Sequence, residues 1–120
     1  MRVLVCGGRD YHNSNHVNDV LSEIRPSVVI EGGARGADFL AADWARANLG
    51  VDALITFRAD WERNGKAAGP IRNQKMLDEG KPDLVVAFPG GRGTADMISR
   101  AIRAGIAVRL ATDPQHHTGE

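Results

Sequence analysis

Three short stretches of the chain combine paired glycines with an arginine, a combination suited to binding phosphate. They read GGRD at 7–10, GGARGAD at 32–38 and GGRGTAD at 90–96. Glycine allows a sharp turn and lets a ligand approach backbone N–H groups closely, and arginine can bind phosphate with two hydrogen bonds. The ligand-binding residues predicted from these stretches are Gly7, Gly8, Arg9, Asp10, Gly32, Gly33, Arg35, Gly36, Asp38, Gly90, Gly91, Arg92, Gly93 and Thr94.

Each stretch follows an apolar run typical of a buried strand, at residues 2–6, 27–31 and 83–88. In a parallel sheet the carboxyl ends of the strands share one edge, where open α/β sheets bind their ligands. The second and third stretches are expected to run directly into helices, whose first amides and positive dipole end favour an anion. The sequence therefore predicts a crevice for phosphate or a nucleotide at that edge.

Two common nucleotide-binding patterns do not fit these stretches. None of them matches G-x-x-x-x-G-K-[ST], so an Mg-ATP P-loop is not predicted, and none gives a clean G-x-G-x-x-G dinucleotide pattern. Asp10 and Asp38 can hold a ribose hydroxyl or orient the neighbouring arginine, and both also suit helix caps.

The elements that must position these residues alternate between strand and helix along the chain. Further apolar runs at 51–57 and 106–110 predict a third and a fifth strand, and apolar stripes predict helices over 17–24, 37–45, 71–79 and 98–105. Continuous apolar strands predict helices on both faces of a parallel sheet. Right-handed crossovers then give a single doubly wound, Rossmann-like α/β domain of about five strands. We expect this domain to span residues 1–111 and a flexible tail to span 112–120.

Residues 58–69 show no apolar period and are predicted to form a loop before the third helix. Pro70 suits the first position of that helix, and Gly80 suits its C-cap. Within the loop, Trp61 and Lys66 are further candidates for the ligand site. A tryptophan there can stack on a base, or it can pack against the domain or a partner chain. Trp44 lies on the apolar stripe of the second helix and is expected in the core or in a dimer contact.

The composition of the 120-residue chain narrows the classes of partner. The formal net charge is zero, which argues against a nucleic-acid partner. Neither a signal peptide nor a run of about 18 apolar residues is visible in the sequence, so we expect a cytoplasmic protein without a membrane partner. His12 and His16 lack the spacing of a metal site, Cys6 is expected in the core, and we expect neither a metal nor a cofactor.

Four segments of the sequence resemble the SLOG superfamily, named for the Smf/DprA and Lonely Guy proteins, and within it the small YspA-like proteins. They read VCGGRDY at 5–11, EGGARGADFLAADWA at 31–45, DWERNGKAAGPIRNQKM at 60–76 and KPDLVVAFPGGRGTADM at 81–97. The segments cover most of the chain, and PGGRGT is the most specific of the matching pieces. The resemblance implies a Rossmann-like fold with a pocket for nucleotides or nucleotide-derived ligands.

Lonely Guy enzymes are phosphoribohydrolases that cleave the N-glycosidic bond of nucleoside 5′-monophosphates. Their signature is PGG-x-GT-x-x-E with an upstream arginine in an R-K pair. Here Arg72 matches that arginine, Asn73 stands in place of the lysine, and Met97 occupies the glutamate position. Glycosidic cleavage needs a carboxylate. Asp96 comes one residue earlier, about 100° away on a helix, so it is expected to replace the glutamate only if the loop is rearranged.

Three functions are compatible with this sequence. The first is a sensor, carrier or sequestering module that binds a nucleotide or nucleotide-derived ligand, with Asn73 added to its site. The second is a hydrolase of nucleotide N-glycosidic bonds that uses Arg72, Arg92 and one of the carboxylates Asp10, Asp38 or Asp96, with Arg72 and Asp96 as the catalytic candidates. The third is a single-stranded DNA-handling role like that of the Smf/DprA branch. A homodimer or higher homo-oligomer is compatible with the small residues on the helices and with an exposed Trp44.

Overall fold

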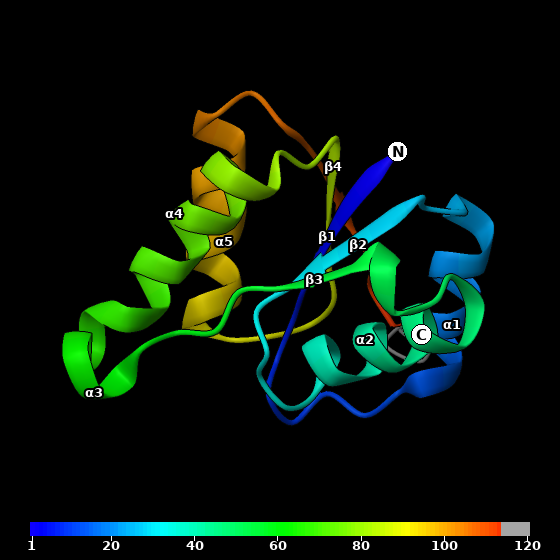
Figure 1. Cartoon of the computed structure of the whole chain (residues 1–120), viewed down its shortest axis with the longest axis horizontal. Helices are drawn as coiled ribbons and strands as arrows, with labels where there is room; N and C mark the ends of the chain where they lie inside the picture. The colour runs from blue at the N-terminus through cyan, green and yellow to red at the C-terminus, as the bar shows by residue number, and fades with distance from the viewer. Residues whose placement is uncertain (114–120) are drawn as a thin grey trace, which may run out of the picture.

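The computed structural model describes residues 1–113 and contains a five-stranded sheet in which all neighbouring strands are parallel (Figure 1). The strand order is β3-β2-β1-β4-β5, so the order changes direction between β1 and β4. The strands are β1 (Arg2–Cys6), β2 (Val28–Glu31), β3 (Leu54–Thr56), β4 (Leu84–Ala87) and β5 (Ala107–Leu110). The predicted doubly wound, Rossmann-like α/β fold is confirmed.

Helices cover both faces of the sheet, as Figure 1 shows. They are α1 (Ser14–Ile24), α2 (Ala37–Asn48), α3 (Trp61–Asn64), α4 (Ala68–Gly80) and α5 (Arg92–Arg103). Alternate residues of β1 serve the two faces: Val3 and Val5 pack with α1 and α2, whereas Leu4 and Cys6 pack with α4 and α5. All four side chains are buried, which explains why this strand reads as a continuous apolar run.

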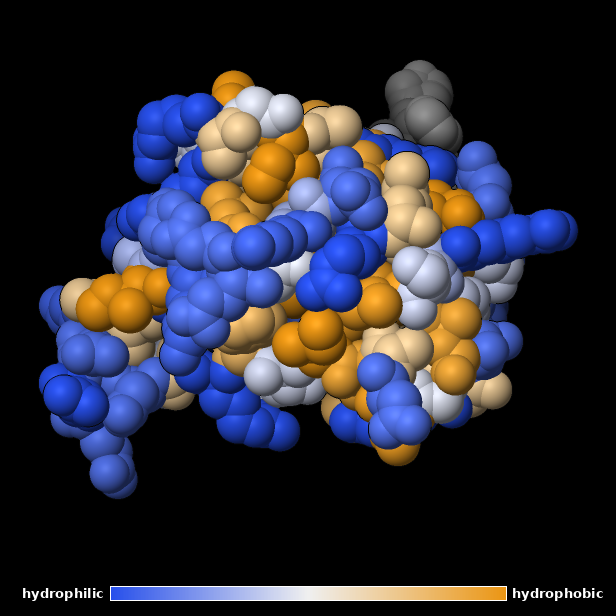
Figure 2. Space-filling view, turned by 45° about the horizontal axis from the view of Figure 1, so that its top comes forward, coloured by the Kyte–Doolittle hydropathy of each residue, from blue (hydrophilic) through white to orange (hydrophobic). Residues whose placement is uncertain are grey.

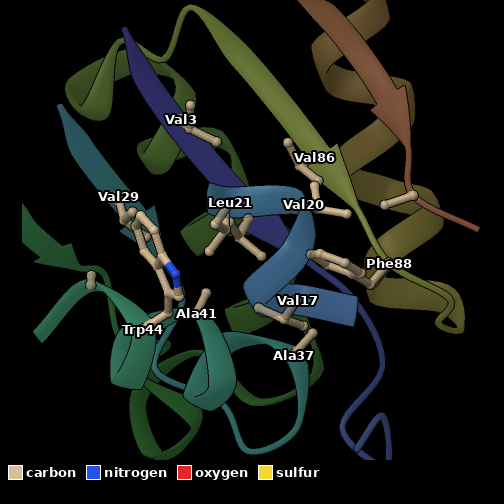
Figure 3. Close-up of a cluster of buried hydrophobic side chains, with 13 residues drawn as sticks. Val3, Val17, Val20, Leu21, Val29, Ala37, Ala41, Trp44, Val86 and Phe88 are labelled. Atoms are coloured by element: carbon tan, nitrogen blue, oxygen red, sulfur yellow. The ribbon is translucent and has the colours of Figure 1, made fainter. Parts of the chain in front are cut away.

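Trp44 belongs to the core on the α1–α2 face, where Figure 3 shows it beside Val29 and Ala41. It is only 8% exposed, and its indole Nε1 donates to Ser22 Oγ at 3.3 Å. Of the two roles expected for Trp44, the structure supports the core, and the expectation that Trp44 is exposed was wrong. Phe88, just beyond β4, packs in the same cluster.

The predicted loop over 58–69 was wrong, because this segment contains α3, a 3-10 turn over Gly65–Ala67 and the start of α4. Asp60 begins α3 by accepting a hydrogen bond from Arg63 N at 3.1 Å, a local signal that a search for apolar periodicity does not detect. The α4 helix begins at Ala68, two residues before Pro70. It includes Gly80, and its C-cap is Lys81 in the left-handed conformation, with φ of 50°.

Two other predicted elements differ from the observed ones. Gly50, with φ of 97°, leads into a 3-10 turn over Val51–Ala53, so β3 pairs with β2 only from Leu54 onward. In α5 the buried positions are Thr94, Met97 and Ala101, whereas Ile102 is 63% exposed. The face of that helix that was predicted to be apolar, which included Ile102, is therefore rotated about the helix axis from the face that is buried.

Large apolar side chains that are exposed come from several different elements. They are Met1, Phe39, Val51, Trp61, Ile71, Ile102 and Leu110. On the face displayed in Figure 2, apolar surface is interspersed with hydrophilic residues. Association into a homo-oligomer stays a prediction.

Both the end of the predicted domain, at Ala111, and the start of the predicted tail, at Asp113, pack against the rest of the chain. Ala111 and Asp113 are buried, and Asn13 Nδ2 donates to Asp113 Oδ2 at 2.9 Å. The remainder of the predicted tail, residues 114–120, lies outside the described residues. Within residues 1–113, no helix is long and apolar enough to cross a membrane.

Candidate nucleotide-binding site

A cavity of about 960 Å³ lies at the carboxyl ends of β1 and β4, where the strand order changes direction. We call it the glycine-loop cavity. The predicted site residues that line it are Gly7, Gly8, Arg9, Asp10, Asp38, Trp61, Lys66, Arg72, Asn73, Gly90, Gly91, Arg92, Gly93, Thr94 and Asp96. Lining residues that sequence reasoning did not include are Cys6, Tyr11, Ala34, Gly69, Pro70, Met76 and Pro89.

Four predicted residues of the second glycine-arginine stretch do not line the cavity: Gly32, Gly33, Arg35 and Gly36. Two of these glycines serve close packing. A Cβ atom on Gly32 would lie 2.8 Å from Arg72 Cζ, and Gly36, with φ of 81°, packs against the backbone of Gly8. The Arg35 guanidinium pairs instead with Asp10 at 3.2 Å, and both side chains are largely exposed.

The first and third stretches pack backbone to backbone. Gly8 N donates to Pro89 O at 2.9 Å, and Ala37 N donates to Gly8 O at 3.1 Å. A Cβ atom on Gly90 would lie 2.7 Å from Gly8 N, so glycine is required there for the two loops to meet. The third stretch leads into α5 at Arg92, as predicted, so the N-terminal end of this helix forms part of the cavity wall.

Asp38 anchors the second stretch from the first turn of α2. Its Oδ2 accepts hydrogen bonds from Gly32 N at 3.1 Å and Ala34 N at 3.3 Å. Burial raises the pKa of the Asp38 carboxyl to about 6, although the hydrogen bond from Ala34 acts in the opposite direction. This carboxyl therefore holds the loop while part of it faces the cavity.

Glu31 is a second buried carboxylate at this edge, and sequence analysis treated it only as the end of a strand. Its Oε1 accepts from Gly33 N at 2.6 Å, and its Oε2 accepts from Thr56 Oγ1 at 2.5 Å. The side chain is 2% exposed and does not line the cavity. The sequence did contain a signal for this role of Glu31, because this acidic residue ends an apolar strand directly before paired glycines.

Arg72 projects from α4 to the second stretch, where its Nη1 donates to Gly32 O at 2.5 Å and its Nε donates to Asn73 Oδ1 at 3.0 Å. Burial lowers the pKa of Arg72, while the negative charge of Asp38 acts to raise it. Asn73 also connects α4 to α5, since its Nδ2 donates to Gly93 O at 3.2 Å and to Asp96 Oδ2 at 3.0 Å. A guanidinium, an amide and a carboxylate thus adjoin on the cavity wall.

Asp96, one of the predicted site residues, and Met97, at the glutamate position of the signature, take different places in the structure. Asp96 lines the cavity, whereas Met97 is fully buried in the core on the α4–α5 face. Arg100 Nε donates to Asp96 Oδ2 at 2.8 Å. Partial burial acts to raise the pKa of Asp96, but hydrogen bonds from Arg100 and Asn73 outweigh it and hold that pKa below its usual range. Asp96 is therefore ionised at neutral pH.

The outer wall of the cavity carries an aromatic ring and cationic groups. The Arg9 guanidinium carbon lies 5.3 Å from the centroid of the Trp61 ring, within cation–π distance. Trp61 is 48% exposed, so it is a surface residue at the cavity and not part of the core. Lys66 and Arg92 are further cations of this wall.

Two comparisons with known proteins identify the family. The family model described as "YspA, cpYpsA-related SLOG family" matches residues 1–64. The chain is also 42% identical over 117 residues to the Gene 61 protein of Mycobacterium phage D29, covering 89% of this chain and 93% of that protein. The match to the family model includes the first two glycine-arginine stretches, and the similarity to the phage protein extends over most of the chain. The chain therefore belongs to the YspA, cpYpsA-related SLOG family.

Proposed function

We propose that the protein binds a nucleotide or nucleotide-derived ligand in the glycine-loop cavity and acts as a sensor, carrier or sequestering module. Membership of the SLOG family supports a nucleotide-related ligand in general. The observation that carries the finer proposal is the cavity itself, which joins the N-terminal end of α5 to four cationic side chains, Arg9, Lys66, Arg72 and Arg92. A helix N-terminus with nearby guanidinium groups suits a phosphate.

The same cavity offers a surface for the base. Trp61 is half exposed beside Arg9, so one apolar ring face and one cation adjoin. Base–aromatic stacking contributes about 1–3 kcal/mol per base. The cavity volume of about 960 Å³ lies near the upper end of the roughly 300–1,000 Å³ range of small-molecule sites. We infer that the phosphate binds against α5 and that the base stacks on Trp61.

Isothermal titration calorimetry with nucleoside monophosphates, ADP-ribose, NAD and cyclic nucleotides tests this proposal. We expect saturable binding that weakens about tenfold to a hundredfold in Arg92→Ala, because a hydrogen bond to a charged group contributes about 1.5–3 kcal/mol. Arg46→Ala is the matched control, because Arg46 is an exposed residue in the last turn of α2 and does not line the cavity. Absence of binding across the panel by correctly folded protein would contradict the proposal.

A second proposal, hydrolysis of a nucleotide N-glycosidic bond, is favoured by the place of Asp96 on the cavity wall. In this reaction water adds to C1′ of the ribose, and the bond to the base breaks. The base leaves with the bonding electrons and gains a proton. An ionised Asp96 can stabilise positive charge on the sugar, and Arg72 can hold the phosphate.

Release of free base from nucleoside 5′-monophosphates, followed by chromatography, tests the hydrolase proposal. We expect Asp96→Asn to lower the rate by at least about a hundredfold, whereas Asp43→Asn, an exposed change on α2, leaves the rate unaltered. An unchanged rate in Asp96→Asn removes that carboxylate from the mechanism. If the native chain releases no base, the protein is not this hydrolase.

A further inference from the structure

The Arg9 guanidinium and the Trp61 indole meet at the glycine-loop cavity, although they come from separate parts of its wall. Arg9 belongs to the first glycine-arginine stretch, after β1, whereas Trp61 begins α3. Figure 1 shows α3 at the far end of α4, well away from the end of β1. The two long side chains nevertheless approach each other, with the guanidinium carbon 5.3 Å from the centroid of the indole ring. This pair therefore connects two walls of the cavity.

Within residues 1–113, the Arg9 guanidinium forms neither a hydrogen bond nor an ion pair. Arg35 and Arg72 differ from it, because each of them donates hydrogen bonds to other groups of the chain. Arg9 is an exposed residue, and a cation–π contact at an exposed site is weak, so this side chain can turn toward a ligand at little cost. An unused guanidinium and an exposed aromatic ring thus border the same space.

The α3 helix, which carries Trp61, is loosely attached to the domain. It has no buried residue, and it packs mainly against the 3-10 turn over Gly65–Ala67 and against α4. At Gly65, with φ of 54°, no atom within residues 1–113 outside its own turn and chain neighbours lies within 4 Å of the Cβ position. A segment with so few buried contacts moves at a low cost in free energy. The distance between Trp61 and Arg9 can therefore change.

We propose that the base of the bound nucleotide lies between the Arg9 guanidinium and the Trp61 indole, and that both groups stack on it. A base can use both of its faces in this way, because indole rings and guanidinium planes each stack on aromatic rings. Stacked carbon atoms lie about 3.5–4.0 Å apart, so a base between the two groups needs a spacing of about 7–8 Å. The present 5.3 Å is too short, so Arg9 or α3 moves by about 2–3 Å. The inference rests on the proposed binding function, and it assigns Arg9 to the base and not to the phosphate.

Calorimetry on the full chain tests the proposal with AMP, GMP, CMP and UMP, and with ribose 5-phosphate, which has no base and is measured by displacement of a bound monophosphate. We expect at least one monophosphate to bind at least about tenfold more tightly than ribose 5-phosphate. Arg9→Ala removes a charge and weakens both ligands, but it should also reduce their ratio of affinities by about threefold or more. Trp61→Ala should reduce that ratio as well. Arg46→Ala, the exposed control on α2, should keep it.

Limited digestion with trypsin, followed by mass spectrometry, measures the movement of α3 separately. Arg63 and Lys66 are exposed cleavage sites on either side of Gly65. At a concentration about ten times its Kd, the tightest-binding monophosphate should slow cleavage at these two sites by about fivefold or more. Ribose 5-phosphate at matched occupancy stabilises the fold equally but offers no base, so it should slow this cleavage at least about threefold less.

An equal loss of affinity for the monophosphate and for ribose 5-phosphate in Arg9→Ala would place Arg9 at the phosphate and overturn the inference. Equal protection of α3 by the two ligands would also overturn it, and so would a failure of all four monophosphates to bind when another nucleotide does. In each of these cases nucleotide binding itself stands. If folded protein binds no nucleotide at all, both the stacking on Arg9 and the proposed function are overturned.

Discussion

At positions 96 and 97 of α5, a carboxylate lies on the cavity wall and a methionine lies in the core. The Lonely Guy signature has its glutamate at the position of Met97, so direct transfer of that signature would have left that position of α5 without an acid. The geometry instead places Asp96 at the cavity, with Asn73 and Arg100 bound to its Oδ2. The rotation of the helix is set by burial of Thr94, Met97 and Ala101. A sequence motif alone does not specify how the helix is rotated about its axis.

Asp38 makes stability depend on pH. Its pKa is raised to about 6 in the folded chain, from about 3.8 when unfolded, so the folded state holds the proton more tightly. Stability is therefore lost as pH rises from about 4 through about 6, by up to about 3 kcal/mol. Asp38→Asn keeps an oxygen for Gly32 N and Ala34 N but does not ionise. We expect the variant to gain stability relative to the native chain across this range.

Urea unfolding of both chains between pH 4 and pH 7.5 measures this difference in the free energy of unfolding. A constant difference across that range would show that the Asp38 carboxyl titrates normally in the folded chain. A variant that becomes less stable relative to the native chain as pH rises would reverse the sign that burial predicts.

At the scale of elements, strands and long helices could be predicted because burial leaves a clear apolar pattern. The continuous runs in β1 and β4 and the stripe in α2 are examples. The short α3 helix has no buried residue, so its only signals are local, above all the Asp60 cap. The edge strand β3 was predicted too long because the 3-10 turn before it is also apolar.

Much of the candidate site could also be predicted, because paired glycines after strands mark the loops that gather at the carboxyl edge. What could not be predicted is which glycines face the ligand space and which pack against other atoms. Gly32 and Gly36 fall in the second group because they meet Arg72 and the backbone of Gly8. Those contacts join residues far apart in sequence, so only the folded chain reveals them.

Two glycines of the third stretch separate a structural role from a binding role. A Cβ atom on Gly90 would meet Thr94 and Gly8, so Gly90→Ala should destabilise the fold by about 1–3 kcal/mol. At Gly93, within residues 1–113, no atom outside its own helix and chain neighbours lies within 4 Å of that position. Gly93→Ala, in the first turn of α5, should leave stability equal or raise it by up to about 1 kcal/mol. It should still weaken nucleotide binding, because the added methyl group keeps phosphate from the backbone.

Chemical unfolding and calorimetry on these two variants give the comparison. Full affinity in Gly93→Ala would mean that the ligand does not approach this turn. Unchanged stability in Gly90→Ala would mean that the loops after β1 and β4 do not need the close contact described here.

The fluorescence of Trp61, in α3, can report ligand binding. Trp61 lines the cavity and is 48% exposed, whereas Trp44 is in the core and away from the cavity. We expect a saturable change in tryptophan fluorescence on titration with the nucleotide that binds best, and loss of that change in Trp61→Phe. A change of equal size in Trp61→Phe would assign the signal to Trp44 and would remove base stacking from the account.

At the scale of the whole molecule, the order of the strands brings the residues of the candidate site together. Because the strand order reverses between β1 and β4, the chain leads from β1 to α1 on one face of the sheet and from β4 to α5 on the other, and the glycine-loop cavity lies at this edge. The chain has a formal net charge of zero. The lining of the glycine-loop cavity nevertheless contains four cationic side chains, Arg9, Lys66, Arg72 and Arg92, beside the carboxylates of Asp10, Asp38 and Asp96. The net charge of the chain therefore does not reveal this local group of cations.

A crystal structure of the chain with its tightest-binding nucleotide at saturating concentration tests the central claim most directly. We predict phosphate oxygens within hydrogen-bonding distance of backbone N–H groups at the start of α5 and of Arg92, with the base against Trp61. Density for the nucleotide only outside the glycine-loop cavity, or a phosphate remote from α5, would contradict the account.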